Sequence, residues 1–152
     1  MVAFEKGKKG ELETVLKNAV EFHGHLGPFV VIGARMGLIG VRELGSKRND
    51  GRLRVTARLK NSVPFSCVID GIQVATNCTI GNKKLRLRNS SGIAARFKLR
   101  NEKQVTIRVH PAIFERLKNK FLSENVSPEE MYKLAQITAS MPEEELFVIE
   151  GK

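Results

Sequence analysis

Apolar side chains recur along the first part of the chain at the spacing of an α-helix. In residues 11–22 they share one helical face and comprise Leu12, Val15, Leu16, Ala19 and Val20. Two glycines in His23-Gly24-His25-Leu26-Gly27 then make continued helix unfavourable. Pro28 suits the first turn of a new helix, because its missing N–H has no helical partner there. We therefore expect one helix over 11–22 and a second over about 28–44, ending before Gly45.

Three glycines, Gly33, Gly37 and Gly40, lie inside the second predicted helix. A glycine in a helix interior costs about 1 kcal/mol relative to alanine, so we expect another element to approach this face closely. A lipid-buried motif of small residues is the competing interpretation. The charged side chains of Arg35 and Arg42 in the same segment argue against it.

From residue 52 the apolar spacing changes to two, as in β-strands with one buried face. Apolar residues alternate with mostly basic or polar ones over 52–60, 83–89, 93–100 and 103–109. A short helix is expected over 66–77, with Val68, Ile72 and Ala75 facing inward. Asn101-Glu102 is expected to form a tight turn between the last two strands.

The C-terminal part predicts two more helices. Pro111 opens one over about 112–121. Ser127-Pro128-Glu129-Glu130 starts the other, with a serine cap and a glutamate three residues after it. The tail is expected to add a final strand or to pack Leu146, Phe147 and Ile149 on the body. The whole pattern predicts one α+β domain over residues 1–152, with helices packed on the apolar face of one antiparallel sheet.

The composition is that of a globular protein, with 41% hydrophobic and 28% charged residues. No stretch approaches the roughly 20 apolar residues that cross a membrane, and the first residues lack a signal-peptide core. We therefore expect a cytoplasmic protein. In that reducing compartment the two cysteines, Cys67 and Cys78, are expected to be thiols.

The net charge of +10 is concentrated on the predicted strands. Fifteen of the 26 basic residues lie between Lys47 and Arg108, against three acidic ones. The strands would gather a candidate anion-binding face of Arg54, Arg58, Arg86, Arg88, Arg96 and Lys98. Nucleic acid, an anionic small molecule and an acidic protein surface all fit it, including the chain's own Glu143-Glu144-Glu145. Nucleic acid is the less favoured partner, because no aromatic residue lies among these cations for base stacking.

Histidine and cysteine carry the candidate chemistry. His23 and His25 lie on a glycine-flanked turn, where imidazoles serve as metal ligands or, as often, as helix caps. Cys67 and Cys78 bracket the short helix and reach one site only if it ends before Cys78; otherwise they are two small buried residues. Asp70 shares the helix face of Cys67, and Gln73 continues it, unless both face solvent. Cys67 and Asp70 are the candidate catalytic residues.

Two segments resemble the motifs of the FmdE-like family, named for its association with formylmethanofuran dehydrogenase. Residues 22–45 resemble its signature F-H-G-H-x-C-P-G, which is followed by a glycine-bearing helix. Residues 66–85 resemble its second motif, C-x-x-D-[AG]-I-Q-x-x-T-x-C-T-x-G, and the tail PEEELF resembles the end of its core domain. The resemblance implies an α+β core, commonly dimeric, whose two motifs form one pocket.

The same resemblance implies a ligand set. It gives His23, His25, Cys67 and Cys78 as metal ligands, with Asp70 and Gln73 beside them. Such a donor set suits zinc or a softer transition metal. The function implied is a metal-binding accessory subunit or small enzyme of formylmethanofuran dehydrogenase-type one-carbon and redox metabolism. A nucleic-acid-binding module and a non-catalytic interaction protein remain the alternatives.

Two positions depart from the family pattern. Gly27 stands where relatives usually carry cysteine, which removes one ligand or nucleophile, and Phe29 stands where they carry glycine. Many relatives also have a C-terminal zinc-ribbon module. No cysteine follows Cys78, so we expect this chain to correspond to the core domain alone.

Overall fold

A computed structural model describes residues 6–100 and 103–151, so the turn expected at Asn101-Glu102 lies outside the described residues. The elements follow in the order α1 (Lys6–His23), α2 (Pro28–Glu43), β1 (Leu53–Arg58), α3 (Cys67–Thr76), β2 (Leu85–Arg88), β3 (Ala94–Leu99), β4 (Lys103–Val109), α4 (Pro111–Ser123), α5 (Pro128–Ser140), α6 (Glu143–Leu146) and β5 (Phe147–Glu150). The predicted helices and strands are confirmed within a few residues, except that α1 begins earlier.

The five strands form one sheet in the order β2-β1-β3-β4-β5. Three of the four strand pairs are antiparallel, and the predicted α+β fold is confirmed. One pair departs from the expected arrangement, because β2 runs parallel to β1. The connection between these two strands contains α3, and a parallel pair needs such a crossover rather than a hairpin.

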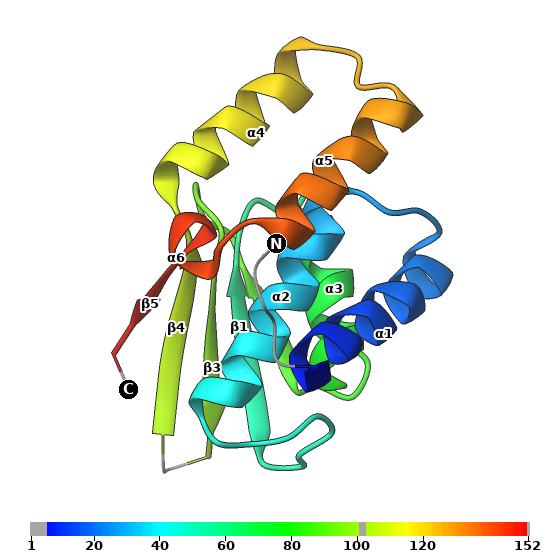
Figure 1. The fold of residues 1–152 in the computed structure, drawn as a ribbon. Helices are drawn as coiled ribbons and strands as arrows, with labels where there is room; N and C mark the ends of the chain where they lie inside the picture. Colours follow the sequence, from blue (N-terminus) through cyan, green and yellow to red (C-terminus); the bar gives the residue numbers. More distant parts are fainter. Residues whose placement is uncertain (1–5, 101–102, 152) are drawn as a thin grey trace.

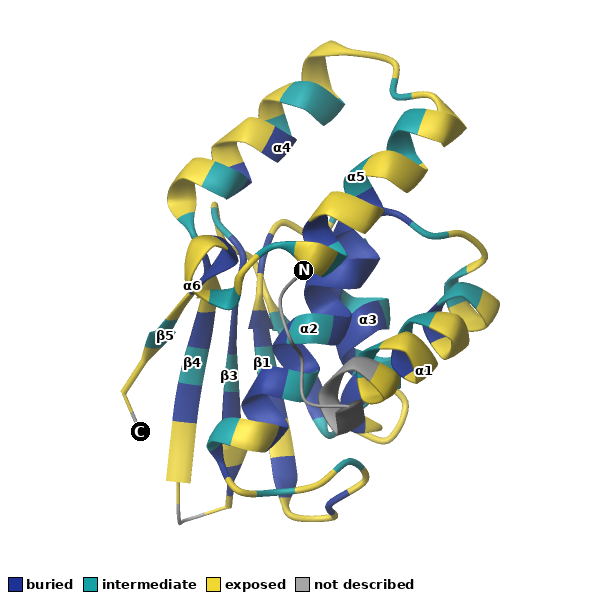
Figure 2. Cartoon of the chain, in the orientation of Figure 1, coloured by how far each residue is buried: buried dark blue, intermediate teal, exposed yellow. Residues whose placement is uncertain are grey.

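The helices lie over one face of the sheet, and α2 crosses directly in front of it (Figure 1). Residues that alternate along β1 are buried toward α2 and exposed on the other side. Figure 2 shows the same division, with the buried residues concentrated on α2 and on the inner positions of the strands. The hydrophobic core therefore lies between α2, α3 and the sheet, and no described helix covers the opposite sheet face.

The glycines of α2 face elements that pass very close to the helix. A Cβ atom at Gly33 would lie 1.9 Å from the carbonyl oxygen of Val68 in α3. One at Gly40 would lie 2.5 Å from the ring of Phe97 in β3, which no real contact allows. The expectation of close approach on this face is confirmed, and it fixes α3 firmly against α2.

Local stop signals end the helices where the sequence places them. Gly45 has a φ angle of +62° just after α2, in the left-handed region that favours glycine. Asn77 takes the same conformation, with a φ of +63°, at the end of α3. The hydroxyl of Ser127 accepts the backbone N–H of Glu130 and caps α5, as predicted. The tail forms the single turn α6 and then β5.

Candidate functional site

The last residue of α1 meets the first turn of α3. His23 and Asp70 are 47 residues apart in sequence, yet Nδ1 of His23 lies 2.6 Å from Oδ2 of Asp70. The chain reverses at Gly24, whose φ angle of +104° is costly for other residues, and this turn sets His23 against α3. Two predicted site residues are thereby joined in one hydrogen bond.

The hydrogen bond to Asp70 fixes how the His23 ring is used. An ionised carboxylate only accepts, so Nδ1 of His23 donates, and in the neutral imidazole Nε2 then carries a lone pair. The His23 side chain is 11% exposed. Its Nε2 is buried and, within the described residues, has no hydrogen-bond partner. A buried polar atom without a partner is costly, which points to a ligand or proton at this position.

His25 and Gln73 extend the contact on both sides. The ring centroids of His23 and His25 are 4.7 Å apart, and His25 is exposed. Gln73 places its amide nitrogen 3.4 Å from Oδ1 of Asp70 and accepts the backbone N–H of Ile80 at 3.0 Å. The predicted polar ridge on α3 is confirmed as a partnered one rather than a solvent-facing one.

A polar groove adjoins this group. It has a volume of about 390 Å³ and contains Gln73 together with Phe22, the neighbour of His23. Its other lining residues are Asn49, Val74, Asn77, Thr79 and Asn82. Side-chain amides and hydroxyls donate and accept hydrogen bonds without charge. The groove therefore offers space for a polar molecule beside the His23–Asp70 pair.

The two cysteines have different surroundings. Cys67 begins α3 one turn before Asp70, and burial together with the negative charge of Asp70 raises the pKa of its thiol. Cys78 is 1% exposed in the hydrophobic core, and its thiol donates to the carbonyl of Leu53 at 3.5 Å. Burial raises its pKa as well.

The structure therefore brings His23, His25 and Asp70 together and leaves Cys78 on another side of α3. The charged groups that act on the Cys78 thiol are Lys84, Arg54 and Asp50, not Asp70. Within residues 6–100 and 103–151, no group of three or more histidine, cysteine and acidic side chains is arranged to hold a metal ion. Sequence reasoning linked Asp70 to Cys67 and missed its bond to His23; a lone carboxylate in an apolar helix was the signal for such a partner.

The position that departs from the family motif also lies at this site. A Cβ atom at Gly27 would lie 3.8 Å from Cδ2 of His25 and 3.0 Å from Sδ of Met131 in α5. The backbone of Gly27 is extended, with a φ angle of −138°, so any residue fits its conformation. A side chain here would point toward the histidine turn.

All six residues of the candidate anion-binding face lie on strands, on the side that the helices leave open. Five are exposed and Arg96 is half-buried. Arg54 lies opposite Lys98 across β1 and β3, and Arg58 lies opposite Arg88 across β1 and β2. In the described part of the chain, none of the six forms an ion pair.

Glu143 does not neutralise this face, although its sequence position allowed that role. It binds Arg42 of α2 through both carboxylate oxygens, each at 2.8 Å. On the sheet itself the acidic partner is Glu150 of β5, which pairs with Arg108 at 3.2 Å. The six-residue face therefore keeps its positive charge.

Comparison with known proteins agrees with the fold. A crystal structure of an FmdE-like protein of tungsten formylmethanofuran dehydrogenase from Syntrophus aciditrophicus superposes with a TM-score of 0.61. It is 20% identical, and the match covers 93% of this chain and 71% of that one. At this identity the likeness establishes the shared fold.

Sequence relationships go further. A protein of Archaeoglobus fulgidus described as a probable S-adenosyl-L-methionine-binding protein is 40% identical over 82 residues. The match spans 53% of this chain but 22% of that relative's length. Residues 22–148 match the family described as "FmdE, Molybdenum formylmethanofuran dehydrogenase operon" and include both histidines and both cysteines. The chain belongs to the FmdE family.

Proposed function

We propose that the His23–Asp70 pair is the centre of a site for a divalent transition metal, most suitably zinc. The observation that carries the proposal is the buried Nε2 of His23, which has no partner in the described structure. A metal-binding histidine usually donates its second ring nitrogen to a carboxylate or carbonyl, which fixes the tautomer and orients the ring. Nδ1 of His23 and Asp70 have this relationship.

The available donors define the form such a site would take. His23 would bind through Nε2, and His25, whose ring lies beside it, is the second candidate ligand. Cys67 is the third, because its thiol lies close enough to Asp70 to be affected by its charge. Cys78 is left out, because its thiol is turned into the core. Few protein ligands leave coordination positions for water or substrate, and zinc with an open position lowers the pKa of bound water.

In this proposal Asp70 positions His23, and the adjoining groove with Gln73 binds the polar molecule acted on or recognised. The membership of the family supports a role as an accessory subunit or small enzyme of formylmethanofuran dehydrogenase-type one-carbon and redox metabolism. We also propose a homodimer, which light scattering of the purified protein would test. Among the described helices, none is long and apolar enough to cross a membrane.

Metal analysis of protein purified without a histidine tag tests the site. We expect about one equivalent of zinc per chain, falling below about a tenth in His23→Ala. His110→Asn is the matched control, because His110 is the third histidine and only caps α4, where its Nδ1 accepts the N–H of Ala112. Wild-type protein that takes up no zinc, or zinc retained in full by His23→Ala, would contradict the proposal.

A second candidate function is the binding of a polyanion by the open sheet face. The specific observation is that like charges face each other across the strands, as Arg54 and Lys98 do, without ion pairs in the described part of the chain. This arrangement is destabilising unless an anion lies over it. We expect the affinity for double-stranded nucleic acid to fall steeply with salt, and the change of Arg54, Arg86 and Lys98 to glutamate to abolish it. A flat dependence of log K on log salt excludes phosphate contacts.

A further inference from the structure

A cavity of about 360 Å³ lies between α1, α2 and the segment that joins α5 to α6. It is lined by the first half of α1, whereas His23 ends that helix, so the cavity is separate from the histidine site. Leu12 and Leu16 of α1 and Leu38 and Ile39 of α2 supply its apolar walls. Its volume is within the range of small-molecule sites, which are mostly apolar with a few placed polar groups.

Arg35 is the placed polar group. It stands on the otherwise apolar α2, and its Nη1 donates to the carbonyls of Thr138 and Met141 at 2.8 and 2.6 Å. Its guanidinium also lies 5.7 Å from the ring centre of Phe147. These contacts fix the head group and occupy both hydrogens of Nη1. An arginine has five N–H donors, so those on Nε and Nη2 remain for another acceptor.

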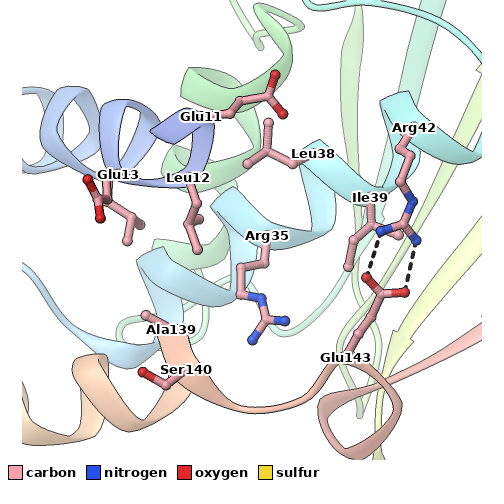
Figure 3. Close-up of a pocket in the computed structure, with 11 residues that line it drawn as sticks. Glu11, Leu12, Glu13, Arg35, Leu38, Ile39, Arg42, Ala139, Ser140 and Glu143 are labelled. Carbon is pink, nitrogen blue, oxygen red and sulfur yellow. Dashed lines mark hydrogen bonds and ion pairs between the residues drawn. The ribbon is translucent and has the colours of Figure 1, made fainter. Parts of the chain in front are cut away.

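The charge of Arg35 has no carboxylate bound to it within the described residues. Burial lowers the pKa of Arg35, and the charge of Glu143 only partly opposes this effect. Glu143 directs its two carboxylate oxygens to Arg42, as the dashed lines in Figure 3 mark. Glu11 and Glu13 are exposed at the rim, and in Figure 3 their carboxylates point away from Arg35. A half-buried cation therefore borders an apolar cavity without a paired anion.

We propose that this cavity binds an aliphatic carboxylate. The alkyl chain would lie against the leucines and Ile39, and the carboxylate would accept N–H groups of Arg35, which form charge-assisted bonds with planar carboxylates. An uncharged apolar ligand would take water from Arg35 and leave its charge unpaired, which is costly. A doubly charged phosphate would meet a single available cation beside the Arg42–Glu143 pair. A monocarboxylate with an apolar body fits both features of the lining.

Titration calorimetry of the full chain with octanoate tests the proposal, with octanamide as the probe of equal length without charge. We expect saturable binding of octanoate that is at least about tenfold tighter than that of octanamide. Arg35→Gln is expected to weaken octanoate binding by at least about tenfold. Arg86→Gln removes the same charge from the opposite sheet face and is the matched control, expected to leave the affinity unchanged.

A second variant guards against misfolding, because Arg35 also holds the end of α5. Leu12→Asp puts a carboxylate on the half-buried wall of the cavity and is expected to repel octanoate to the same extent. Methyl resonances of Leu38 and Ile39 should shift on addition of octanoate, which locates the ligand.

Four results would overturn the inference. One is the absence of saturation at about 10 mM octanoate, where a site of any specificity is occupied. Another is equal affinity for octanoate and octanamide. The third is an affinity that Arg86→Gln lowers as much as Arg35→Gln does. The last is a shift of the Leu38 and Ile39 methyl resonances with protein concentration instead of octanoate, which would assign the cavity to a second copy of the chain.

Discussion

Replacing Gly33 by alanine tests the contact that sets α3 against α2. The added Cβ atom would lie 1.9 Å from the carbonyl oxygen of Val68 and 2.8 Å from its carbonyl carbon. Ordinary C···O contacts begin at about 3.3 Å, so the two backbones must separate by about 1.4 Å. No side-chain rotation relieves this clash, because both partners are fixed to helical backbone.

The separation has a large cost. A radial gap of about 0.5–1 Å already removes a quarter to a half of each dispersion contact, and the interface of α2 and α3 includes the fully buried Val68 and Ile72. We expect Gly33→Ala to lower the free energy of unfolding by about 3 kcal/mol, the upper range for overpacked cores. Asp70 lies two residues after Val68, so the same displacement should loosen its bond to His23.

Urea unfolding followed by far-UV circular dichroism measures the effect. Gly10→Ala is the matched control, because Gly10 is also helical and a Cβ there meets nothing within 4 Å. That control should gain roughly 0.5–1 kcal/mol from helix propensity alone. If Gly33→Ala unfolds within about 0.5 kcal/mol of wild type, the close approach of α2 and α3 is not a determinant of stability.

Three further changes give separate tests. Gly27→Cys places a thiol beside His25, so its zinc affinity should exceed that of Gly27→Ala, which adds the same Cβ, by at least about tenfold; equal affinities in equilibrium dialysis would contradict this. Hydrogen bonds from Arg52 and Ser46 hold the pKa of Asp50 far below its usual range, so its stabilising effect is present above the unfolded-state pKa and is lost as the pH falls. In urea unfolding, the deficit of Asp50→Asn should therefore shrink below about pH 4, and a constant deficit would argue against it. Native protein should present at most one thiol, Cys67, to a disulfide reagent at neutral pH, because Cys78 is in the core; rapid reaction of both in the folded chain would show that Cys78 is accessible.

The sequence alone was sufficient for the elements and their ends. Pro28, Gly45 and Asn77 act within a single turn of helix, so their effect does not depend on what packs around them. The period of two in the strands likewise predicts one buried and one exposed face, and the six cations do lie on the exposed one. The glycines of α2 went further and indicated a close neighbour, although not which one.

Tertiary structure decided which of these residues meet. The bond between His23 and Asp70 joins positions 47 residues apart, and it depends on how α1 and α3 pack on α2. The burial of Cys78 follows from the left-handed turn at Asn77, which directs the thiol to Leu53 rather than to the histidines. The parallel pairing of β2, and the cavity in which Arg35 has donors to spare, also arise only when distant elements come together. Short-range sterics fix local conformation from neighbouring residues, whereas a site requires side chains whose proximity is set by the packing of the whole core.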